Sequence, residues 1–292
     1  MNSETPPTSL TEGSGDHAAL RSACRDGAGL CTIVNIEGSF SRRLGAQLAV
    51  HADGSVTGSL ADGCLERQLV SEVMAARAEG AAKLRRFGKG SELIDFRLPC
   101  GSGIDILIDP EPDRDACRAA LSKLDARQEA ALDLPIPSGA AGMLERRRYI
   151  PALRLQLIGE GPELEALASL ATAAGIACET YRRGEPGLAL GRAPDGLSTD
   201  EWTAVVLLFH DHEWEAAILE WALSTSAFYV GAQGGQAARD DRLAMLQTRG
   251  MSAETLTRLR SPIGLVPHCR EPGTLAISIL AEITGAYDAL PR

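Results

Sequence analysis

The second half of the chain alternates between short apolar runs and longer segments of helical periodicity. The run AVVLLF at 204–209 is apolar throughout, which is typical of a central parallel strand that is buried on both faces. Regular alternation of strands and helices favours a parallel sheet covered by helices on both sides. This half of the chain is therefore expected to form a Rossmann-like, doubly wound domain.

The same periodicities give approximate limits for each element. In the second half we expect strands over 153–159, 176–181, 204–209 and 227–231, and helices over 163–174, 212–224, 237–249 and 272–285. In the first half we expect strands over 30–36, 46–52 and 104–108, and helices over 17–26, 66–81 and 113–132. Asp53-Gly54 favours a tight hairpin after the second of these strands.

Composition divides the chain into four parts. Residues 1–16 are polar and aperiodic, which predicts a disordered tail. The stretch DLPIPSGAAG at 133–142 is rich in Pro, Gly and Ala, which is typical of a domain boundary. We therefore expect an N-terminal α/β domain over 17–135, a linker over 136–150 and the Rossmann-like domain over 151–292.

The net charge of −10 argues against partners that are polyanions. Nucleic acid and anionic membranes are therefore not expected to bind this chain. The basic clusters Lys83–Arg86 and Arg146–Arg148 are short, and we interpret them as solvated helix faces or linkers. We expect no membrane span and no secretory leader. The seven cysteines form no CxxC pair, which favours reduced thiols in the cytoplasm over a zinc site.

A glycine turn, Gly159-Glu160-Gly161, follows the first strand of the Rossmann-like half and precedes a helix. Glycines at such a turn let a pyrophosphate approach the backbone and the helix N-terminus. A third glycine is replaced by Leu164, and Arg182 stands near the strand end where a ribose-binding acid is usual. The turn therefore predicts one of two things: a phosphate-binding site, or a structural turn whose glycines bind no ligand. In a phosphate-binding site, Arg182 is compatible with a nucleotide that carries a 2′-phosphate.

Three glycine-bearing segments mark the first half: GSFSRRLGAQLAV, GSLADGCLE and LPCGSGIDILIDP. Arg42 and Arg43 carry planar donors that suit a phosphate or a carboxylate. Gln47 has the donor and acceptor that the edge of a pterin-like heterocycle requires. Cys64 precedes a predicted helix, whose positive end lowers a thiol pKa, and Cys100 lies in a turn. The alternative for each cysteine is a small buried apolar side chain.

Two histidine-containing segments are candidates for other chemistry. His210-Asp211-His212 follows a strand, but adjacent residues do not easily converge on one metal ion. We expect Asp211 to cap the next helix and this segment to line a site, without a metal. His268-Cys269 is adjacent in sequence, which rarely gives the geometry of a nucleophile and its base.

The segment GSFSRRLGAQLAVHADGSVTGSLADGCLE resembles the motif of the XdhC/CoxI family, and the later blocks LIGEGPELEALASLA, VVLLFHDHEWEAAIL, FYVGAQGG, RLRSPIGL and EPGTLAISILAEI follow in the family's order. The resemblance spans roughly residues 17–287. It implies an accessory factor for xanthine dehydrogenase, carbon monoxide dehydrogenase and related molybdenum hydroxylases. Such a factor binds molybdenum cofactor (molybdopterin or its cytidine dinucleotide form), helps a cysteine desulfurase to sulfurate it, and delivers it to the apo-enzyme.

By this resemblance the site residues have two kinds of role. Cys64 or Cys100 is expected to lie near the molybdenum, where it steadies the metal or assists sulfur exchange; these two are the candidate catalytic residues. The expected cofactor-binding residues are Arg42, Arg43, Gly45, Gln47, Gly63, Glu66, Gly101, Gly159, Gly161, His210, Asp211 and Gly231. Self-association is also expected by family analogy.

The chain departs from the family pattern in several loops. Ser41 stands where Pro or Tyr is usual, Asp62-Gly63 replaces a double glycine, and Arg182 replaces an acid. The segments 232–236 (AQGGQ) and 264–270 (GLVPHCR) also differ. Two other functions therefore remain open at this point: a nicotinamide-dependent oxidoreductase, and a regulatory or scaffold protein that keeps the fold without the cofactor. If the chain is a maturation factor or a scaffold protein, it is an accessory protein and not a turnover enzyme.

Overall fold

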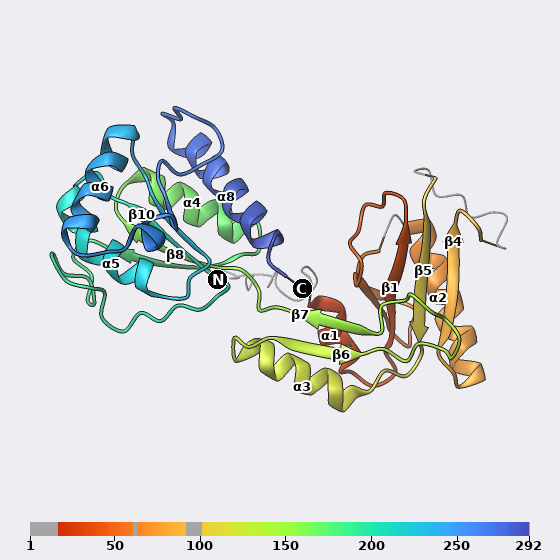
Figure 1. Cartoon of the computed structure of the whole chain (residues 1–292). Coiled ribbons are helices and arrows are strands. Elements are labelled where there is room, and N and C mark those ends of the chain that lie inside the picture. Colours follow the sequence, from red (N-terminus) through yellow and green to blue (C-terminus); the bar gives the residue numbers. More distant parts are fainter. Residues whose placement is uncertain (1–16, 61–62, 92–100, 292) are drawn as a thin grey trace, which may run out of the picture. The chain divides into compact units, whose positions relative to one another are not determined.

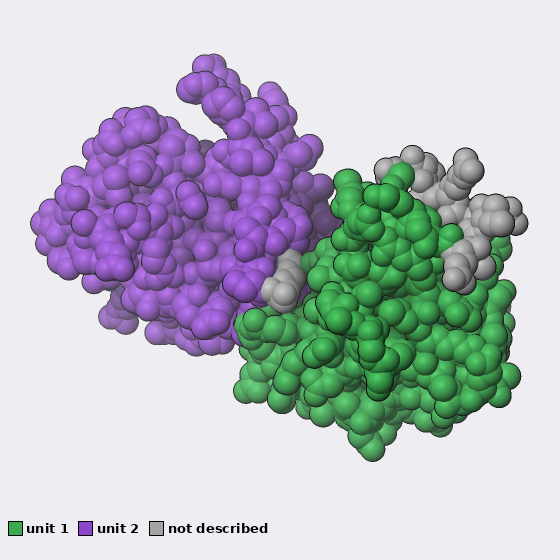
Figure 2. All heavy atoms as spheres, turned by 45° about the vertical axis from the view of Figure 1, so that its right-hand side comes forward, with its two compact units in different colours: residues 1–151, 292 green, residues 152–291 purple. Residues whose placement is uncertain are grey.

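The structure is a computed structural model that describes residues 17–60, 63–91 and 101–291. The chain forms two compact units, one ending at Pro151 and the other spanning Ala152–Pro291, which are coloured separately in Figure 2. Each unit has its own hydrophobic cores.

Unit 1 is built on an antiparallel five-stranded sheet in the order β3-β2-β1-β5-β4. Its strands are β1 (Gly29–Glu37), β2 (Gln47–Val50), β3 (Val56–Gly58), β4 (Lys83–Gly88) and β5 (Gly103–Asp109). Its helices are α1 (Ala18–Ala23), α2 (Gly63–Glu79) and α3 (Arg114–Asp125), and a separate two-stranded sheet joins β6 (Ala130–Asp133) to β7 (Arg146–Tyr149).

Both faces of the unit 1 sheet are covered, as the alternation along β1 requires. Cys31 and Ile33 pack with α2 on one face, whereas Leu30 and Val34 pack with α1 and α3 on the other. Successive side chains of a strand point to opposite faces, so the unbroken burial of residues 29–34 in β1 fits only a sheet that is covered on both sides.

Several expectations for unit 1 were wrong. The cluster Lys83–Arg86 belongs to the edge strand β4, and Arg146–Arg148 belongs to β7, which lies inside the expected linker. The charges of β4 are balanced, since Arg85 contacts Glu72 at 2.9 Å. Charged side chains suit an edge strand, and their long stems still pack against its neighbour. The helix expected over 113–132 ends at Asp125, and β6 follows it.

Unit 2 confirms the Rossmann-like prediction. Its sheet is parallel, in the order β12-β11-β10-β8-β9. The strands are β8 (Arg154–Gly159), β9 (Ala177–Arg182), β10 (Thr203–Leu208), β11 (Tyr229–Ala232) and β12 (Leu259–Arg260). The helices are α4 (Pro162–Ala173), α5 (Glu215–Ser224), α6 (Gln236–Thr248), α7 (Ala253–Leu256) and α8 (Pro272–Asp288), with a 3₁₀ turn, η1 (His212–Trp214), before α5.

Helices cover both faces of this sheet, as Figure 1 shows for α4 and α8 against α5 and α6. Val206 and Leu208 of β10 pack in the core that includes α4 and α8, and Val205 and Leu207 pack in the core that includes α5. The apolar run at 204–209 is thus buried on both sides. The short elements α7 and β12 were not predicted, and residues 183–202 join β9 to β10 without a helix.

Among the residues that the structure describes, no helix combines the length and the apolar character that a membrane crossing requires.

Candidate functional site

Two neighbouring strands of the unit 2 sheet lead to opposite faces. β8 continues into α4, and β10 continues through η1 into α5. The loops after β8 and β10 therefore border a topological switch point, where open α/β sheets bind ligands. The predicted glycine turn and the predicted pair His210-Asp211 both lie at this edge of the sheet.

The predicted glycines of unit 2 occupy crowded or left-handed positions. A Cβ on Gly159 would lie 2.2 Å from the carbonyl oxygen of Leu208, and φ of Gly159 is +157°. Gly161, with φ +92°, is the N-cap of α4. A Cβ on Gly231 would lie 2.6 Å from Ile263 Cγ2. Backbone geometry at Gly159 and Gly161, and side-chain packing at Gly231, thus favour glycine whether or not a ligand binds beside it.

Carboxylates surround the start of α4. Glu163 and Glu165 lie in its first turn, and Glu160 precedes it. Arg182, at the position expected for a ribose-binding acid, pairs with Glu165 at 2.9 Å. Arg183 lies 3.4 Å from Glu160. These carboxylates offset the positive end of the helix and lower its attraction for a phosphate.

The segment after β10 has the capping role that we expected. The backbone N–H of Glu213 donates to Asp211 Oδ1 at 3.1 Å, so Asp211 caps η1. The His210 imidazole is exposed, and its Nε2 lies 3.5 Å from Glu163 Oε2. No group of three or more His, Cys, Asp and Glu side chains within the described ranges is arranged to hold a metal ion.

A pocket of about 660 Å³ opens beside these loops. It lies between the loops that follow β11 and β12, at the first residues of α6 and α8, and it is lined by Glu163, His210, Gln233–Gln236, Pro262–Pro272 and Leu275. This volume is in the range of small-molecule sites. Two of the segments that depart from the family pattern, 232–236 and 264–270, meet in this pocket.

Gln233 is fixed in the wall of this pocket. Its backbone N–H donates to the carbonyl of Leu207 at 3.0 Å, and its own carbonyl accepts from Arg242 Nη2 at 2.5 Å. The residue is only 9% exposed, and its side-chain Oε1 is buried without a hydrogen-bond partner among the described residues. An orphaned buried acceptor is costly, so its presence at a pocket wall points to a ligand donor.

A buried ion pair supports the loop that carries Gln233. Both nitrogens Nε and Nη2 of Arg242 donate to the Glu215 carboxylate at 2.7 Å, and Nη1 donates to Ser261 Oγ at 3.0 Å. His212 Nδ1 lies 2.8 Å from the same carboxylate. This network joins α5, α6 and the loops after β11 and β12 into one support for the pocket.

In unit 1 the described glycine-bearing loops that follow β1 and β3 and precede β5 lie at one end of the sheet (Figure 1). Glu37 is paired with Gly103 there. A Cβ on Gly38 would lie 3.5 Å from Ser102 Cβ, so the first and third segments are neighbours. The antiparallel topology therefore brings these motifs together, although they are far apart in sequence.

A hydrogen-bond pair also ties the first segment to the second. The Arg42 guanidinium donates to the carbonyl and to Oγ of Ser59, at 3.2 and 3.1 Å. Ser59 lies shortly before α2, which begins at Gly63. Arg42 and Arg43 are both exposed, so the first two motifs present cations and a helix N-terminus at the same end of the unit.

The predicted residues at and near α2 and β5 differ in exposure and in how far the structure describes them. Gly63 and Gly101 are exposed, and Glu66 Oε1 is buried without a hydrogen-bond partner among the described residues. Cys64 is the second residue of α2, but its side chain lies outside what the structure describes, and so does all of Cys100.

Gln47 and Gly45 lie in the interior. Gln47 Nε2 donates to Thr32 Oγ1 at 3.0 Å, and the Tyr149 hydroxyl donates to Gln47 Oε1 at 2.8 Å. The Gly45 carbonyl accepts from Arg147 Nε at 2.8 Å. Both ends of the Gln47 carboxamide are thus already bonded within the protein, which favours a packing role over contact with a heterocycle.

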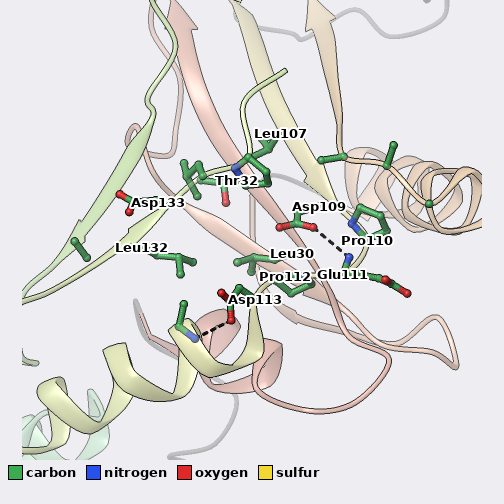
Figure 3. Close-up of a pocket in the computed structure, with 17 residues that line it drawn as sticks. Leu30, Thr32, Leu107, Asp109, Pro110, Glu111, Pro112, Asp113, Leu132 and Asp133 are labelled. Carbon is green, nitrogen blue, oxygen red and sulfur yellow. Dashed lines mark hydrogen bonds between the residues drawn. The ribbon is translucent and has the colours of Figure 1, made fainter. Parts of the chain in front are cut away.

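A second pocket, of about 600 Å³, lies elsewhere in unit 1, between β1, β5, α3 and β6 (Figure 3). Its walls carry Asp109, Glu111, Asp113 and Asp133. Burial raises the pKa of the Asp109 carboxyl, although Oδ1 accepts a hydrogen bond from the Glu111 N–H at 3.1 Å. A pocket lined by acids is a poor site for a phosphate-bearing ligand, and none of the predicted site residues line it.

Three other cysteines behave as buried apolar residues. Burial raises the pKa of the Cys117 thiol to about 12 and that of Cys178 to about 11, and it raises the pKa of fully buried Cys31 as well. Thiols of this kind stay protonated and unreactive at neutral pH.

Sequence reasoning missed Gln233, Arg242 and Glu215 as functional candidates. Gln233 offered one usable pattern, because a polar residue directly after a buried strand and before two glycines lies at the ligand-binding edge of a parallel sheet. No sequence pattern indicated a role for Arg242 or Glu215, since each resembles an ordinary charged residue of an amphipathic helix.

Comparisons with known proteins cover both units. A family model described as the XdhC Rossmann domain matches residues 155–283, and a model described as the XdhC and CoxI family matches residues 23–88. A crystal structure described as a xanthine dehydrogenase from Bacillus halodurans has a TM-score of 0.74, covering 96% of this chain and 97% of that one. At 20% identity this likeness shows the fold alone.

Two relatives come from Escherichia coli (strain K12). The molybdenum cofactor insertion chaperone PaoD is 34% identical over 269 residues, covering 88% of this chain and 82% of PaoD. The uncharacterized protein YqeB is 24% identical over 280 residues, covering 90% of this chain but 44% of YqeB. The extent of the match to PaoD, together with the matches in both units, shows that this chain belongs to the XdhC and CoxI family.

Proposed function

We propose that this protein is a maturation factor that binds molybdenum cofactor, shields it, assists its sulfuration and inserts it into a molybdenum hydroxylase. The likeness to PaoD carries the proposal, because 34% identity extends over most of both chains and PaoD is a molybdenum cofactor insertion chaperone. The cofactor is cargo in this scheme. The protein binds it and releases it, and it does not turn it over.

The end of the unit 1 sheet supports the proposal. Arg42 and Arg43 provide charge-assisted donors for a phosphate or for the oxygens of the metal group. The α2 N-terminus adds its positive dipole, and Cys64 is its second residue. We assign Cys64 or Cys100 the role of steadying the molybdenum or assisting sulfur exchange, with Gly63, Glu66 and Gly101 lining the same end.

Handing over a cargo sets a limit on how tightly the protein holds it. Affinity differences between related complexes lie mostly in the dissociation rate, so a carrier that binds too tightly releases its cofactor too slowly. Sites made of exposed arginines and helix ends suit this need better than a closed cavity. Moderate affinity is therefore part of the proposed mechanism.

This role also requires partner proteins and a cellular compartment. We propose a molybdenum hydroxylase apo-enzyme as the recipient, a cysteine desulfurase as the sulfur source, and self-association of the carrier. We place the protein in the reducing cytoplasm, since the five cysteines with described side chains, Cys24, Cys31, Cys117, Cys178 and Cys269, are free thiols.

Cofactor retention tests the proposal. The purified protein is incubated separately with molybdopterin, with its cytidine dinucleotide form and with NADPH, and each ligand that remains after gel filtration is measured. Retention of a pterin form is expected. Retention of NADPH with turnover would favour a nicotinamide-dependent oxidoreductase, and retention of none would favour a scaffold protein.

A pair of arginine variants shows whether unit 1 contributes. Arg42→Gln removes one charge-assisted donor and is expected to weaken pterin retention about tenfold. Arg118→Gln is the matched control, because Arg118 is also an exposed arginine of unit 1 but lies on α3, paired with Asp115. Equal retention by both variants would remove Arg42 from the site.

A further inference from the structure

We propose that the pocket of unit 2 binds a phosphorylated, amino-bearing heterocycle, with the phosphate at the N-terminus of α6 and the N–H edge at Gln233 and Glu163. The glycine turn Gly159–Gly161 is then a structural turn and not the phosphate site. This inference rests on the proposed function and deepens it, because molybdopterin and its dinucleotide form belong to this ligand class.

Two helix N-termini border the pocket, and that of α6 is open to an anion. α6 follows Gly235 and α8 follows Glu271, and neither N-cap residue makes a side-chain capping bond. Neither helix has an acidic residue in its first turn. The first N–H groups and aligned peptide dipoles of α6 therefore face the pocket with no carboxylate in the N-cap or first turn of that helix, which attracts a phosphate. At α8 the N-cap residue is Glu271, a carboxylate, and the first residue is Pro272, which has no N–H, so α6 is the better phosphate site.

The start of α4 offers the opposite electrostatic environment. Its first turn carries Glu163 and Glu165, and Glu160 lies in the glycine turn itself. Arg182 and Arg183 do not leave cations available there, because they pair with Glu165 and Glu160. A phosphate would meet carboxylates at α4, but no acidic residue in the N-cap or first turn of α6.

Two buried acceptors point to the other end of the ligand. Gln233 Oε1 and Glu163 Oε2 both belong to residues that line the pocket, and both are buried without a hydrogen-bond partner among the described residues. The nearest imidazole to Glu163 Oε2 is that of His210, at 3.5 Å. A pair of acceptors selects a ligand with several N–H groups, such as the amino and ring N–H groups of a pterin or an aminopyrimidine.

The pocket is held in shape by contacts behind its walls. Arg242 fixes the Gln233 carbonyl, as described above. On the other side, Ser278 Oγ of α8 accepts from the Val266 N–H at 2.7 Å, and Glu282 Oε2 accepts from the Gly264 N–H at 2.5 Å. A binding site that is anchored in this way needs little reorganisation to receive a ligand.

A charge placed at the start of α6 tests the phosphate position. Ala237→Glu puts a carboxylate in the first turn of α6, where Ala237 is exposed, so the helix gains stability while its N-terminus loses attraction for an anion. Ala244→Glu is the matched control, with the same charge at an exposed site near the other end of the same helix. Each full-length variant is titrated with molybdopterin, with the cytidine dinucleotide form and with NADPH.

The expected result is a loss of about tenfold or more in affinity for Ala237→Glu and a change of less than about twofold for Ala244→Glu. Glu165→Gln removes an acid from α4 and is expected to leave affinity unchanged. Equal affinities for Ala237→Glu and Ala244→Glu, or tighter binding by Glu165→Gln, would overturn the proposed phosphate position. Thermal melts establish that every variant is folded.

Gln233→Leu tests the heterocycle edge, because leucine keeps the bulk of the side chain but removes its acceptor. Affinity is expected to fall about tenfold, with Gln247→Leu, an exposed change on α6, as the control. Unchanged affinity in Gln233→Leu would overturn this contact.

The three ligands separate a failure of the pocket from a failure of the proposed function. If the unaltered protein binds NADPH but neither pterin form, and Ala237→Glu weakens that binding, the pocket assignment stands and the maturation role fails. If pterin binds equally to all variants, the maturation role stands and the pocket assignment fails. If no ligand binds the unaltered protein, both fail.

Discussion

Gly159 is the residue whose identity the backbone constrains most clearly. A Cβ there would lie 2.2 Å from the Leu208 carbonyl oxygen, because β8 and β10 pass closely side by side. Gly161 has a left-handed φ of +92°, but the nearest atom to its Cβ would be Glu163 Oε2, at 3.4 Å, on a flexible side chain. The two glycines of one turn are thus required for different physical reasons.

We predict that Gly159→Ala lowers the free energy of unfolding by about 3 kcal/mol or more, since backbone must shift to admit the methyl group. Gly161→Ala meets no backbone and is expected to cost about 1 kcal/mol, for its left-handed φ. Urea denaturation of both variants measures the difference. Equal costs would mean that the close approach of β8 and β10 is not what fixes this turn.

At the scale of elements, the alternation of apolar runs and helical segments was enough to predict unit 2. β10 was predictable because it is apolar on both faces, and the helices because their apolar positions recur at helical spacing. β4 and β7 were not predictable, because Lys83–Arg86 and Arg146–Arg148 carry charges that local patterns assign to solvated helices or loops. Their strand pairing is decided by neighbours that are distant in sequence.

The candidate site shows the same division. Sequence patterns located the motifs that gather at one end of the unit 1 sheet, because glycines and arginines stand out locally. They did not reveal the hydrogen bonds of Gln47, because its partners Thr32 and Tyr149 come from other parts of the chain. They missed Gln233, since only the folded pocket reveals that its Oε1 lacks a partner.

The Arg242–Glu215 pair links α6 to α5 and is almost fully buried. Arg242→Met is expected to lower the free energy of unfolding by about 3–5 kcal/mol, because it leaves the Glu215 carboxylate buried without its cation. The double variant Glu215→Gln/Arg242→Met removes that charge as well, and it is expected to be more stable than Arg242→Met alone. Chemical denaturation compares the two. A double variant no more stable than the single one would show that the buried charge is not the cause.

At the scale of the whole molecule, each of the two units has positive groups or helix N-termini that suit an anionic cofactor. Unit 1 presents Arg42, Arg43 and the start of α2 at one end of its sheet. Unit 2 presents a pocket bordered by two uncapped helix N-termini. These features, and membership of the XdhC and CoxI family, lead to one account: the protein carries a phosphate-bearing pterin cofactor and gives it up to an enzyme.

Transfer of the cofactor is the most direct test of that account. Apo-enzyme of a molybdenum hydroxylase is mixed either with this protein loaded with sulfurated cofactor or with an equal amount of free cofactor, and the bound molybdenum and the activity of the hydroxylase are measured over time. The account predicts faster and more complete activation by the loaded protein. Activation no better than that by free cofactor, from protein shown to carry its load, would contradict it.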